Sequence, residues 1–142
     1  MWSGYLALLT AAAFAGIALH VSLAEQPARL RLDPQAMLMQ WQTSYSRAAI
    51  VQVVLLVIAT LCGIIAFFHA YDWRWLLGAV LIAAPWPYTM LVIMPTNRQL
   101  KETLPEQADE QTHGLIRQWG LLHLVRTALG ALATLEYFWA LN

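Results

Sequence analysis

Residues 48–68 read AAIVQVVLLVIATLCGIIAFF, an apolar run that contains no charged side chain. The hydrocarbon core of a bilayer is about 30 Å thick, and an α-helix of about 20 residues spans it. The run therefore predicts a helix that crosses a membrane. Three further stretches have a similar length and apolar character, and each is bounded by charge or proline: residues 2–24, 75–94 and 119–141.

The composition agrees with a membrane protein. Apolar residues make up 60% of the 142-residue chain and charged residues 11%, whereas ordinary soluble domains contain about 25% charged residues. The formal net charge is zero, so no broad basic surface exists to attract nucleic acid. The lone cysteine, Cys62, cannot form an intramolecular disulfide, which excludes thiol-relay chemistry. We predict an all-α fold, a single integral membrane four-helix bundle over residues 1–142.

The first apolar stretch could be mistaken for a cleaved signal peptide, because Ser22 and Ala24 supply small residues before Glu25. The amino end has no basic residue, however, and the apolar run exceeds the roughly 7 to 15 residues of a signal core. We expect it to stay in the protein as the first membrane helix.

Basic residues gather in two of the three connections. The first connection carries Arg29, Arg31 and Arg47 and the third carries Arg98, Lys101 and Arg117, whereas the second carries only Arg74. Cytoplasmic loops of membrane proteins are rich in Lys and Arg, so both termini are expected outside. We expect a multi-pass protein of the bacterial inner (plasma) membrane, in contact with the lipid bilayer.

Two spans are predicted to begin as helices before they enter the membrane, at residues 34–47 and 104–118. Asp33 followed by Pro34 is typical of an N-cap with proline at the first helical position. Thr103 with Glu106 forms a candidate capping box ahead of the last helix. These inner extensions could roof the bundle or lie along the bilayer surface, and the sequence does not choose between the two.

Polar side chains inside a membrane span cost a few kcal/mol, so each one needs an explanation. The exceptions in and beside the spans are His20, Gln52, Asn97, His123, Arg126 and Glu136. In the predicted topology all but Glu136 lie toward the inner side of the membrane, and we expect these five to face one inner cavity. Glu136 is expected at the outer interface.

Two of these polar residues lie with Trp119 on one face of the fourth span. Trp119, His123 and Arg126 follow i, i+4, i+7 spacing and therefore share a helix face. Taken singly, a histidine in a bundle most often hydrogen-bonds another helix, and Arg126 could extend toward the headgroups. The convergence of polar groups from four helices at one depth favours a ligand pocket instead.

Small residues and prolines indicate how the helices pack. Ala12 and Gly16 line up with His20, and such a stripe lets a neighbouring helix approach closely, so the closest approach is expected at Gly16. Pro85 and Pro87 should kink the third helix and open room for a ligand beside Tyr88.

An arginine beside a histidine supplies a fixed cation and a titratable base. Such a pair can hold an anionic phenolate, enolate or carboxylate and move its proton, and Asn97 could donate to a developing oxyanion. A metal would need about three ligands, for which His20, Glu25 and His123 are the candidates. His20 and His123 are also conceivable haem ligands. No recognised metal or haem motif is present, so no cofactor is assigned.

Three segments resemble a known family. VSLAEQPAR at residues 21–29, MPTNRQL at 94–100 and WGLLHLVR at 119–126 are similar to the signature segments of the anthrone oxygenase-like family, in the same order and spacing. The P-T-N-R and W-x-x-x-H-x-x-R parts are the most specific. The resemblance implies a four-helix membrane protein from a family whose members mostly have no assigned reaction.

The characterised members of that family insert oxygen from O2 into an activated aromatic methylene. By resemblance, His123 would remove the benzylic proton, Arg126 would hold the resulting anion and Asn97 would orient an oxygen. The predicted catalytic residues are these three. The resemblance adds Glu25 and Trp119 as substrate contacts, and the positions of His20, Gln52 and Tyr88 in the spans add these three. An electron-rich carbanion can react with O2 without a cofactor, so the lack of a metal motif is no objection to this mechanism, and a metal-assisted oxygenase stays open.

A second hypothesis belongs to a different class: a non-catalytic membrane protein that binds a small ligand or assists another protein. Both hypotheses predict a small lipophilic or aromatic ligand. The sequence leaves the substrate and any homo-oligomer open.

The charge distribution generates a testable topology. Alkaline phosphatase fused after Asn142 should be active outside the cytoplasm, because six of the eight basic residues lie in the first and third connections. The same reporter fused within the third connection should be inactive and serves as the control. Activity of a cytoplasm-specific reporter at Asn142 would contradict the prediction.

Overall fold

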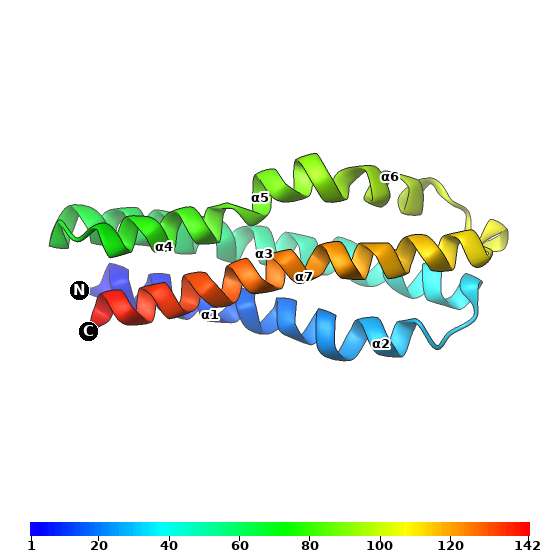
Figure 1. The fold of residues 1–142 in the computed structure, drawn as a ribbon, viewed down its shortest axis with the longest axis horizontal. Helices are drawn as coiled ribbons and strands as arrows, with labels where there is room; N and C mark the ends of the chain where they lie inside the picture. The colour runs from blue at the N-terminus through cyan, green and yellow to red at the C-terminus, as the bar shows by residue number, and fades with distance from the viewer.

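The computed structural model describes residues 1–142 as four helical rods that pack lengthwise (Figure 1). The first rod comprises α1 (Trp2–His20), the π-helical turn η1 (Val21–Glu25) and α2 (Gln26–Arg29); the second is α3 (Pro34–Ala70); the third comprises α4 (Trp73–Ala83), α5 (Pro85–Tyr88), the π-helical turn η2 (Thr89–Ile93) and α6 (Met94–Glu102); the fourth is α7 (Glu110–Leu141). The predicted all-α fold with four helices is confirmed.

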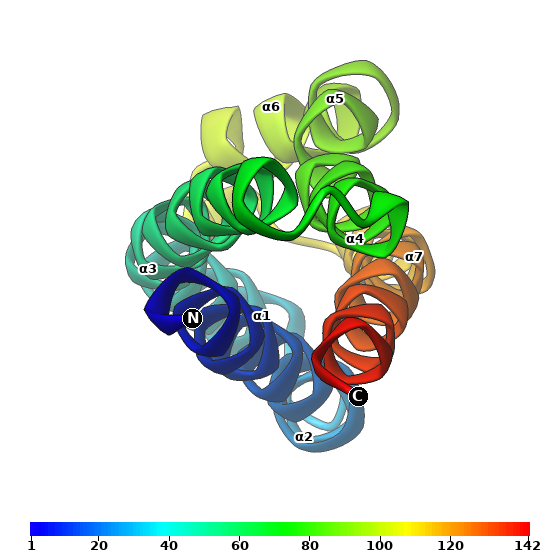
Figure 2. The ribbon, with the colours of Figure 1, turned by 90° about the vertical axis from the view of Figure 1, so that its left-hand side faces the viewer.

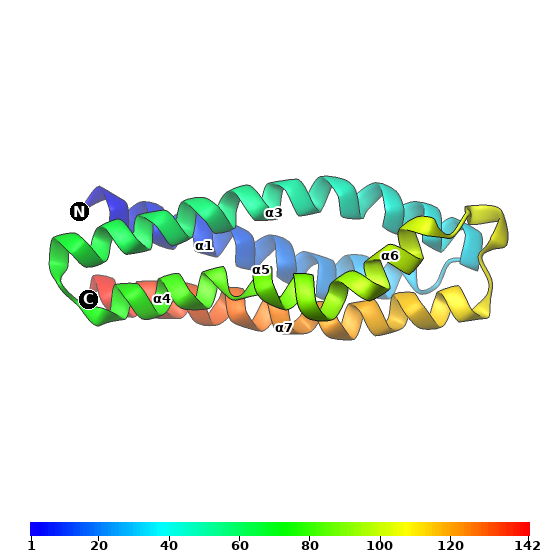
Figure 3. The same ribbon diagram turned by 90° about the horizontal axis from the view of Figure 1, so that it is seen from above.

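Both termini lie at one end of the bundle, and the rods occupy four corners when viewed from that end (Figure 2). The connections before α3 and before α7 lie together at the opposite end (Figure 3). In the view of Figure 3, α3 continues straight past the predicted span, so residues 34–47 lengthen the bundle instead of folding back.

Three rods are long and apolar enough to cross a membrane: Trp2–Arg29, Pro34–Ala70 and Trp73–Glu102. The fourth, α7, is comparable in length but is not among them. His123, Arg126 and Glu136 lower its apolar character. α7 nevertheless packs along both α1 and α4, so it belongs to the same bundle.

The helix starts obey local capping rules, but one of them is not where the sequence predicted it. Asp33 caps α3 by accepting a hydrogen bond from the backbone of Ala36, at 3.1 Å, as expected. The predicted capping box at Thr103 is wrong: the Thr103 hydroxyl donates to the last turn of α6. A capping box between Asp109 and Thr112 starts the last helix instead. Residues 104–109 are therefore a loop with a short 3₁₀ turn (η3, Pro105–Gln107).

The connection between α3 and α4 is short and closed by hydrogen bonds. Tyr71 ends α3 in the left-handed region, with φ of 51°. Asp72 accepts from the backbone and side chain of Arg74, at 3.0 and 2.8 Å. The side-chain bond from Arg74 is the main cause that lowers the pKa of the Asp72 carboxyl.

Glycines admit large aromatic rings into the half of the bundle near the termini. Tyr137 is fully buried, and a side chain at Gly63 or Gly78 would collide with its ring. The Tyr137 hydroxyl donates to the carbonyl of Ala59 at 2.9 Å. Rings and small residues thus form a tightly packed core in this half.

Gly16 takes no part in this packing, so the prediction that it marks the closest helix approach is wrong. A Cβ at Gly16 would meet nothing within 4 Å, and the stripe through Ala12 and Gly16 is exposed. The buried small-residue face of α1 is formed by Ala7, Ala11, Ala15 and Ala18. Because α1 has small residues on both faces, their spacing alone could not identify the buried one.

Prolines interrupt the regular α-helix in the first and third rods. The third rod breaks at Ala84, ahead of Pro85, as predicted, and α5 moves away from α3 (Figure 1). Pro27 and Pro95 each follow a π-helical turn. Proline lacks an N–H and its ring clashes with the carbonyl four residues earlier, so a wider turn accommodates it. Such turns occur frequently at functional sites.

The glycines of the tightly packed half provide a stability test. Gly78→Ala should lower the free energy of unfolding by about 1 to 3 kcal/mol, because the new methyl group overpacks the Tyr137 ring. Gly16→Ala is the matched control and should leave stability unchanged or slightly raised. Thermal unfolding in detergent measures both. Equal effects of the two substitutions would contradict the packing described.

Candidate functional site

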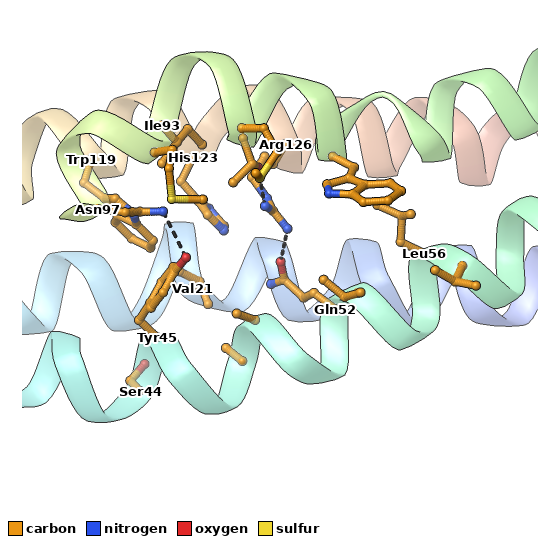
Figure 4. Close-up of a pocket in the computed structure, with 18 of the residues that line it drawn as sticks. Val21, Ser44, Tyr45, Gln52, Leu56, Ile93, Asn97, Trp119, His123 and Arg126 are labelled. Carbon is orange, nitrogen blue, oxygen red and sulfur yellow. Dashed lines mark hydrogen bonds between the residues drawn. The ribbon is translucent and has the colours of Figure 1, made fainter. Parts of the chain in front are cut away.

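A cavity of about 200 Å³ lies between the core near the termini and a second apolar cluster at the opposite end. Its polar lining comes chiefly from α3, η2, α6 and α7 (Figure 4), which supply Tyr45, Gln52, Thr89, Asn97, His123 and Arg126, with Arg29 of α2 at its edge. The other walls are mostly apolar. Four of the lining residues are also exposed on the outer surface: Val53, Val57, Trp86 and Met90. The cavity therefore opens sideways, between α3 and the α5–η2 segment.

Five of the residues predicted from sequence line this cavity: Gln52, Asn97, Trp119, His123 and Arg126. They come from three of the four rods, whereas the depth argument expected all four to contribute, and the predicted residue of the first rod, His20, is absent. The other three predicted residues do not line it.

His20 and Tyr88 are the clear errors. His20 is exposed on the outward face of α1. The prediction that its side chain points into the cavity is therefore wrong. The Tyr88 hydroxyl donates to the carbonyl of Leu122 at 2.9 Å. Tyr88 thus fastens α5 to α7 and does not reach the cavity.

Arg126 enters the cavity with only neutral partners. Its Nη1 donates to the Thr89 hydroxyl at 2.5 Å and its Nη2 to Gln52 Oε1 at 2.6 Å. Its Nε is buried without a partner. The ion pairs of the chain are Arg29–Glu25 and Arg74–Asp72, so no carboxylate balances Arg126. Charges inside proteins are normally paired. Because the Arg126 guanidinium has no charged partner, it can attract an anionic ligand.

Arg29, which also touches the cavity, is fully engaged. Its guanidinium donates to Glu25 and Gln26, both at 3.1 Å, and to Gln40 at 2.5 Å. It also lies 5.5 Å from the centre of the Trp119 ring, in a cation–π contact. Glu25 is therefore the counter-ion of Arg29 and stands behind the cavity wall, which explains why it does not line the cavity.

Trp119 connects several of these groups. Its ring stacks on His123 with centroids 4.9 Å apart and planes inclined by 26°. Its Nε1 donates to Asn97 Oδ1, and Asn97 Nδ2 donates to the Tyr45 hydroxyl, both at 2.9 Å. Each end of the Asn97 amide therefore has a protein partner.

A second chain of hydrogen bonds starts at His123. Its Nδ1 lies 3.2 Å from the Ser22 hydroxyl, which lies 2.9 Å from the Thr127 hydroxyl. The Thr127 hydroxyl donates to the backbone carbonyl of Ala18 at 3.2 Å. A carbonyl only accepts, so when Thr127 gives its proton to Ala18, Ser22 donates to Thr127 and Nδ1–H of His123 donates to Ser22; we assign this direction to the chain.

This direction leaves the other ring nitrogen, Nε2, without a proton. No protein group hydrogen-bonds Nε2, and the ring edge points into the cavity in Figure 4. His123 is therefore arranged to accept a proton from a ligand without first changing its tautomer.

Tyr45, Ser22, Thr89 and Thr127 were missed by sequence reasoning. Tyr45 stands seven residues before Gln52 and Thr127 four residues after His123, so helical spacing could have placed each on the face of a predicted site residue. Ser22 and Thr89 lie in the π-helical turns, where ideal helical spacing fails; Ser22 falls within the family segment at residues 21–29, and no signal in the sequence marks Thr89.

The candidate metal ligands do not converge. No three side chains among His, Cys, Asp and Glu are grouped as a metal site would require. His20 faces outward and Glu25 is paired with Arg29, so neither joins His123 in a metal set, and His20 does not face His123 across the cavity as a haem pair would.

The chain matches the model of a known protein family. A family model described as anthrone oxygenase matches residues 41–135, a range that contains Tyr45, Gln52, Asn97, His123 and Arg126. The chain belongs to the anthrone oxygenase family, as the resemblance of its segments predicted. Curated proteins and solved structures give no match.

The hydrogen-bond chain at His123 predicts one tautomer. Nitrogen NMR of protein labelled at histidine should show a protonated Nδ1 and an unprotonated Nε2 for His123 in its neutral form. The double substitution Ser22→Ala, Thr127→Val should abolish this preference, because Nδ1–H then loses its acceptor.

The His123→Gln spectrum identifies the resonance, since the chain has four histidines. A protonated Nε2 in the unsubstituted protein would show that the direction assigned to the chain is incorrect.

Proposed function

We propose that this protein is an O2-dependent oxygenase of lipophilic aromatic substrates that carry an acidic methylene conjugated to a carbonyl oxygen. The observation that carries the proposal is Arg126: a guanidinium inside the bundle without a carboxylate partner, one helical turn from a histidine whose Nε2 is free. Membership of the anthrone oxygenase family supports the same chemistry.

In the proposed reaction, Nε2 of His123 takes one proton from the methylene. The remaining electron pair spreads onto the conjugated oxygen, and Arg126 balances the resulting negative charge. The anion transfers an electron to O2 and the two radicals combine at the former methylene carbon. The proton returns to give a hydroperoxide, which loses water to leave a carbonyl. Overall, the methylene and O2 become a carbonyl and one water.

The cavity suits such a substrate. Its walls are mostly apolar, and at about 200 Å³ it is smaller than the roughly 300 to 1,000 Å³ typical of ligand pockets. A tricyclic ligand would fill it and extend into the sideways opening beside Trp86 and Met90. In a bilayer that opening would face lipid, from which a lipophilic ligand can enter.

The proposal includes four membrane spans, with α7 as the fourth and both termini outside the cytoplasm. It rests on the basic residues of the first and third connections and on the packing of α7 against α1 and α4. The polar residues that make α7 less apolar, His123 and Arg126, line the cavity and not the outer surface. The membrane proposed is the bacterial inner (plasma) membrane.

A non-catalytic ligand-binding protein is the second candidate. The uncompensated charge of Arg126 would serve an anion binder equally well. The free Nε2 of His123 favours the oxygenase, because binding alone needs no base aimed at the ligand.

Two substitutions test the roles with anthrone as the substrate and oxygen uptake as the measurement. His123→Gln should slow oxygen uptake by about a hundredfold or more, because glutamine cannot take the proton, with anthrone binding changed only a few-fold. Arg126→Lys should weaken binding of the anthrone anion by about ten- to a hundredfold, because an ammonium cannot reproduce the planar donor fork.

His69→Gln is the matched control, since His69 is exposed near the termini, far along α3 from the cavity. Unchanged oxygen uptake in His123→Gln would remove the base assignment. Tight anthrone binding by the unsubstituted protein without oxygen uptake would favour the non-catalytic candidate, and an Arg126→Lys protein that does not fold would point to a structural role.

A further inference from the structure

The hydrogen bonds from Trp119 through Asn97 to Tyr45 have one possible direction. An indole N–H only donates, so the atom of Asn97 that faces Trp119 at 2.9 Å must be the amide oxygen. The amide nitrogen then faces Tyr45, also at 2.9 Å. An amide NH2 only donates as well, so the Tyr45 oxygen is the acceptor in that bond.

The Tyr45 hydroxyl therefore keeps its own proton for another partner. No carbonyl, carboxylate or other acceptor of the protein takes it: the bond from Asn97 is the only hydrogen bond of this hydroxyl. Tyr45 lines the cavity and is only half-buried, so the proton is available to a ligand.

The position of the hydroxyl is fixed by its surroundings. The Tyr45 ring stacks on Trp41 with centroids 4.8 Å apart and planes inclined by 13°. Lys101 lies with its Nζ 4.7 Å from the Tyr45 ring centre. With the ring held by these contacts and the oxygen held by Asn97, the hydroxyl remains at the cavity wall (Figure 4).

We propose that Tyr45 is a catalytic residue that donates a hydrogen bond to the carbonyl or enolate oxygen of the ligand. This inference rests on the proposed function and names the atom of the substrate that the site recognises. A hydrogen bond to an oxygen strengthens as negative charge develops on it, so a preset donor favours removal of the proton by His123. Tyr45 and Arg126 together then form the oxyanion site, with Trp119 and Asn97 as positioning residues.

The proposal implies a ligand with an oxygen that accepts a hydrogen bond from Tyr45. It therefore predicts that the protein distinguishes ligands of the same shape that carry or lack this oxygen. Three tricyclic probes separate the oxygen contact of Tyr45 from the proton removal by His123. Anthrone has both the carbonyl and the acidic methylene. A dimethylanthrone carries two methyl groups and no acidic hydrogen on the methylene carbon, and anthracene has no oxygen. Dimethylanthrone keeps the carbonyl but offers nothing to His123, so its binding reports the oxygen contact alone.

Tyr45→Phe keeps the stacked ring and removes only the hydroxyl. It should weaken the binding of dimethylanthrone by about tenfold and leave anthracene binding unchanged, as measured by tryptophan fluorescence in nanodiscs. The infrared carbonyl stretch of bound dimethylanthrone should also move to higher frequency, because a hydrogen bond to the carbonyl is lost. Tyr137→Phe, which loses a buried hydrogen bond to Ala59 away from the cavity, should change neither measurement.

Equal weakening of dimethylanthrone and anthracene would mean that Tyr45 has only a structural role and would overturn the proposal. So would failure of the unsubstituted protein to bind dimethylanthrone. If Tyr45→Phe does not fold, a fluorinated tyrosine at position 45 keeps the shape and donates more strongly, and the carbonyl stretch should move to lower frequency; no movement would overturn the proposal.

The two proposals fail separately. In one outcome, Tyr45→Phe loses the preference for dimethylanthrone over anthracene while the unsubstituted protein takes up no oxygen with anthrone. That result would support the Tyr45 donor and contradict the oxygenase. Normal oxygen uptake with unaltered selectivity in Tyr45→Phe would support the oxygenase and contradict the Tyr45 donor.

Discussion

A single guanidinium, that of Arg126, determines how the polar half of the bundle is arranged. A charged group inside an apolar bundle is costly unless its donors are satisfied. The satisfying oxygens come from two other rods, Gln52 on α3 and Thr89 on η2. Thr89 is available because the third rod breaks before Pro85 and widens into a π-helical turn ahead of Pro95. The same irregularity that satisfies Arg126 separates this rod from α3 and opens the cavity.

Two hydrogen-bond chains of opposite polarity end at this cavity. One begins at a group that can only donate, the indole of Trp119, and ends with a free proton on Tyr45. The other is anchored on a group that can only accept, the carbonyl of Ala18, and ends with a free lone pair on His123. The first direction cannot be reversed, because an indole N–H and an amide NH2 only donate; the second is the direction assigned when Thr127 donates to Ala18. With these assignments the cavity offers both a donor and an acceptor to a ligand, which is the arrangement that proton transfer requires.

The sequence predicted the architecture well because bilayer thickness and hydrophobicity are coarse constraints. The apolar run at residues 48–68 and its three counterparts correspond to the four rods, and the spacing from Trp119 to Arg126 placed three lining residues on one face. Errors arose where the rotation of a helix had to be chosen: His20 and Gly16 share a face of α1 that is exposed. Hydrophobicity could not decide between two faces that both carry small residues. Tyr45 escaped notice for another reason, since its role depends on the order of donors and acceptors in three dimensions.

The site and the stability of the last helix are linked. α7 is the least apolar of the four rods because it carries His123 and Arg126, and in the proposed topology it would enter a bilayer poorly by itself. His123 and the two terminal nitrogens of Arg126 obtain hydrogen-bond partners from other rods only when α3 and η2 supply Gln52 and Thr89 and when η1 supplies Ser22. Assembly of the fourth rod onto the other three and assembly of the site are therefore one event. Substitutions that remove these acceptors act on folding and on chemistry together, so a separate measurement of each is needed before a lost activity is assigned to either.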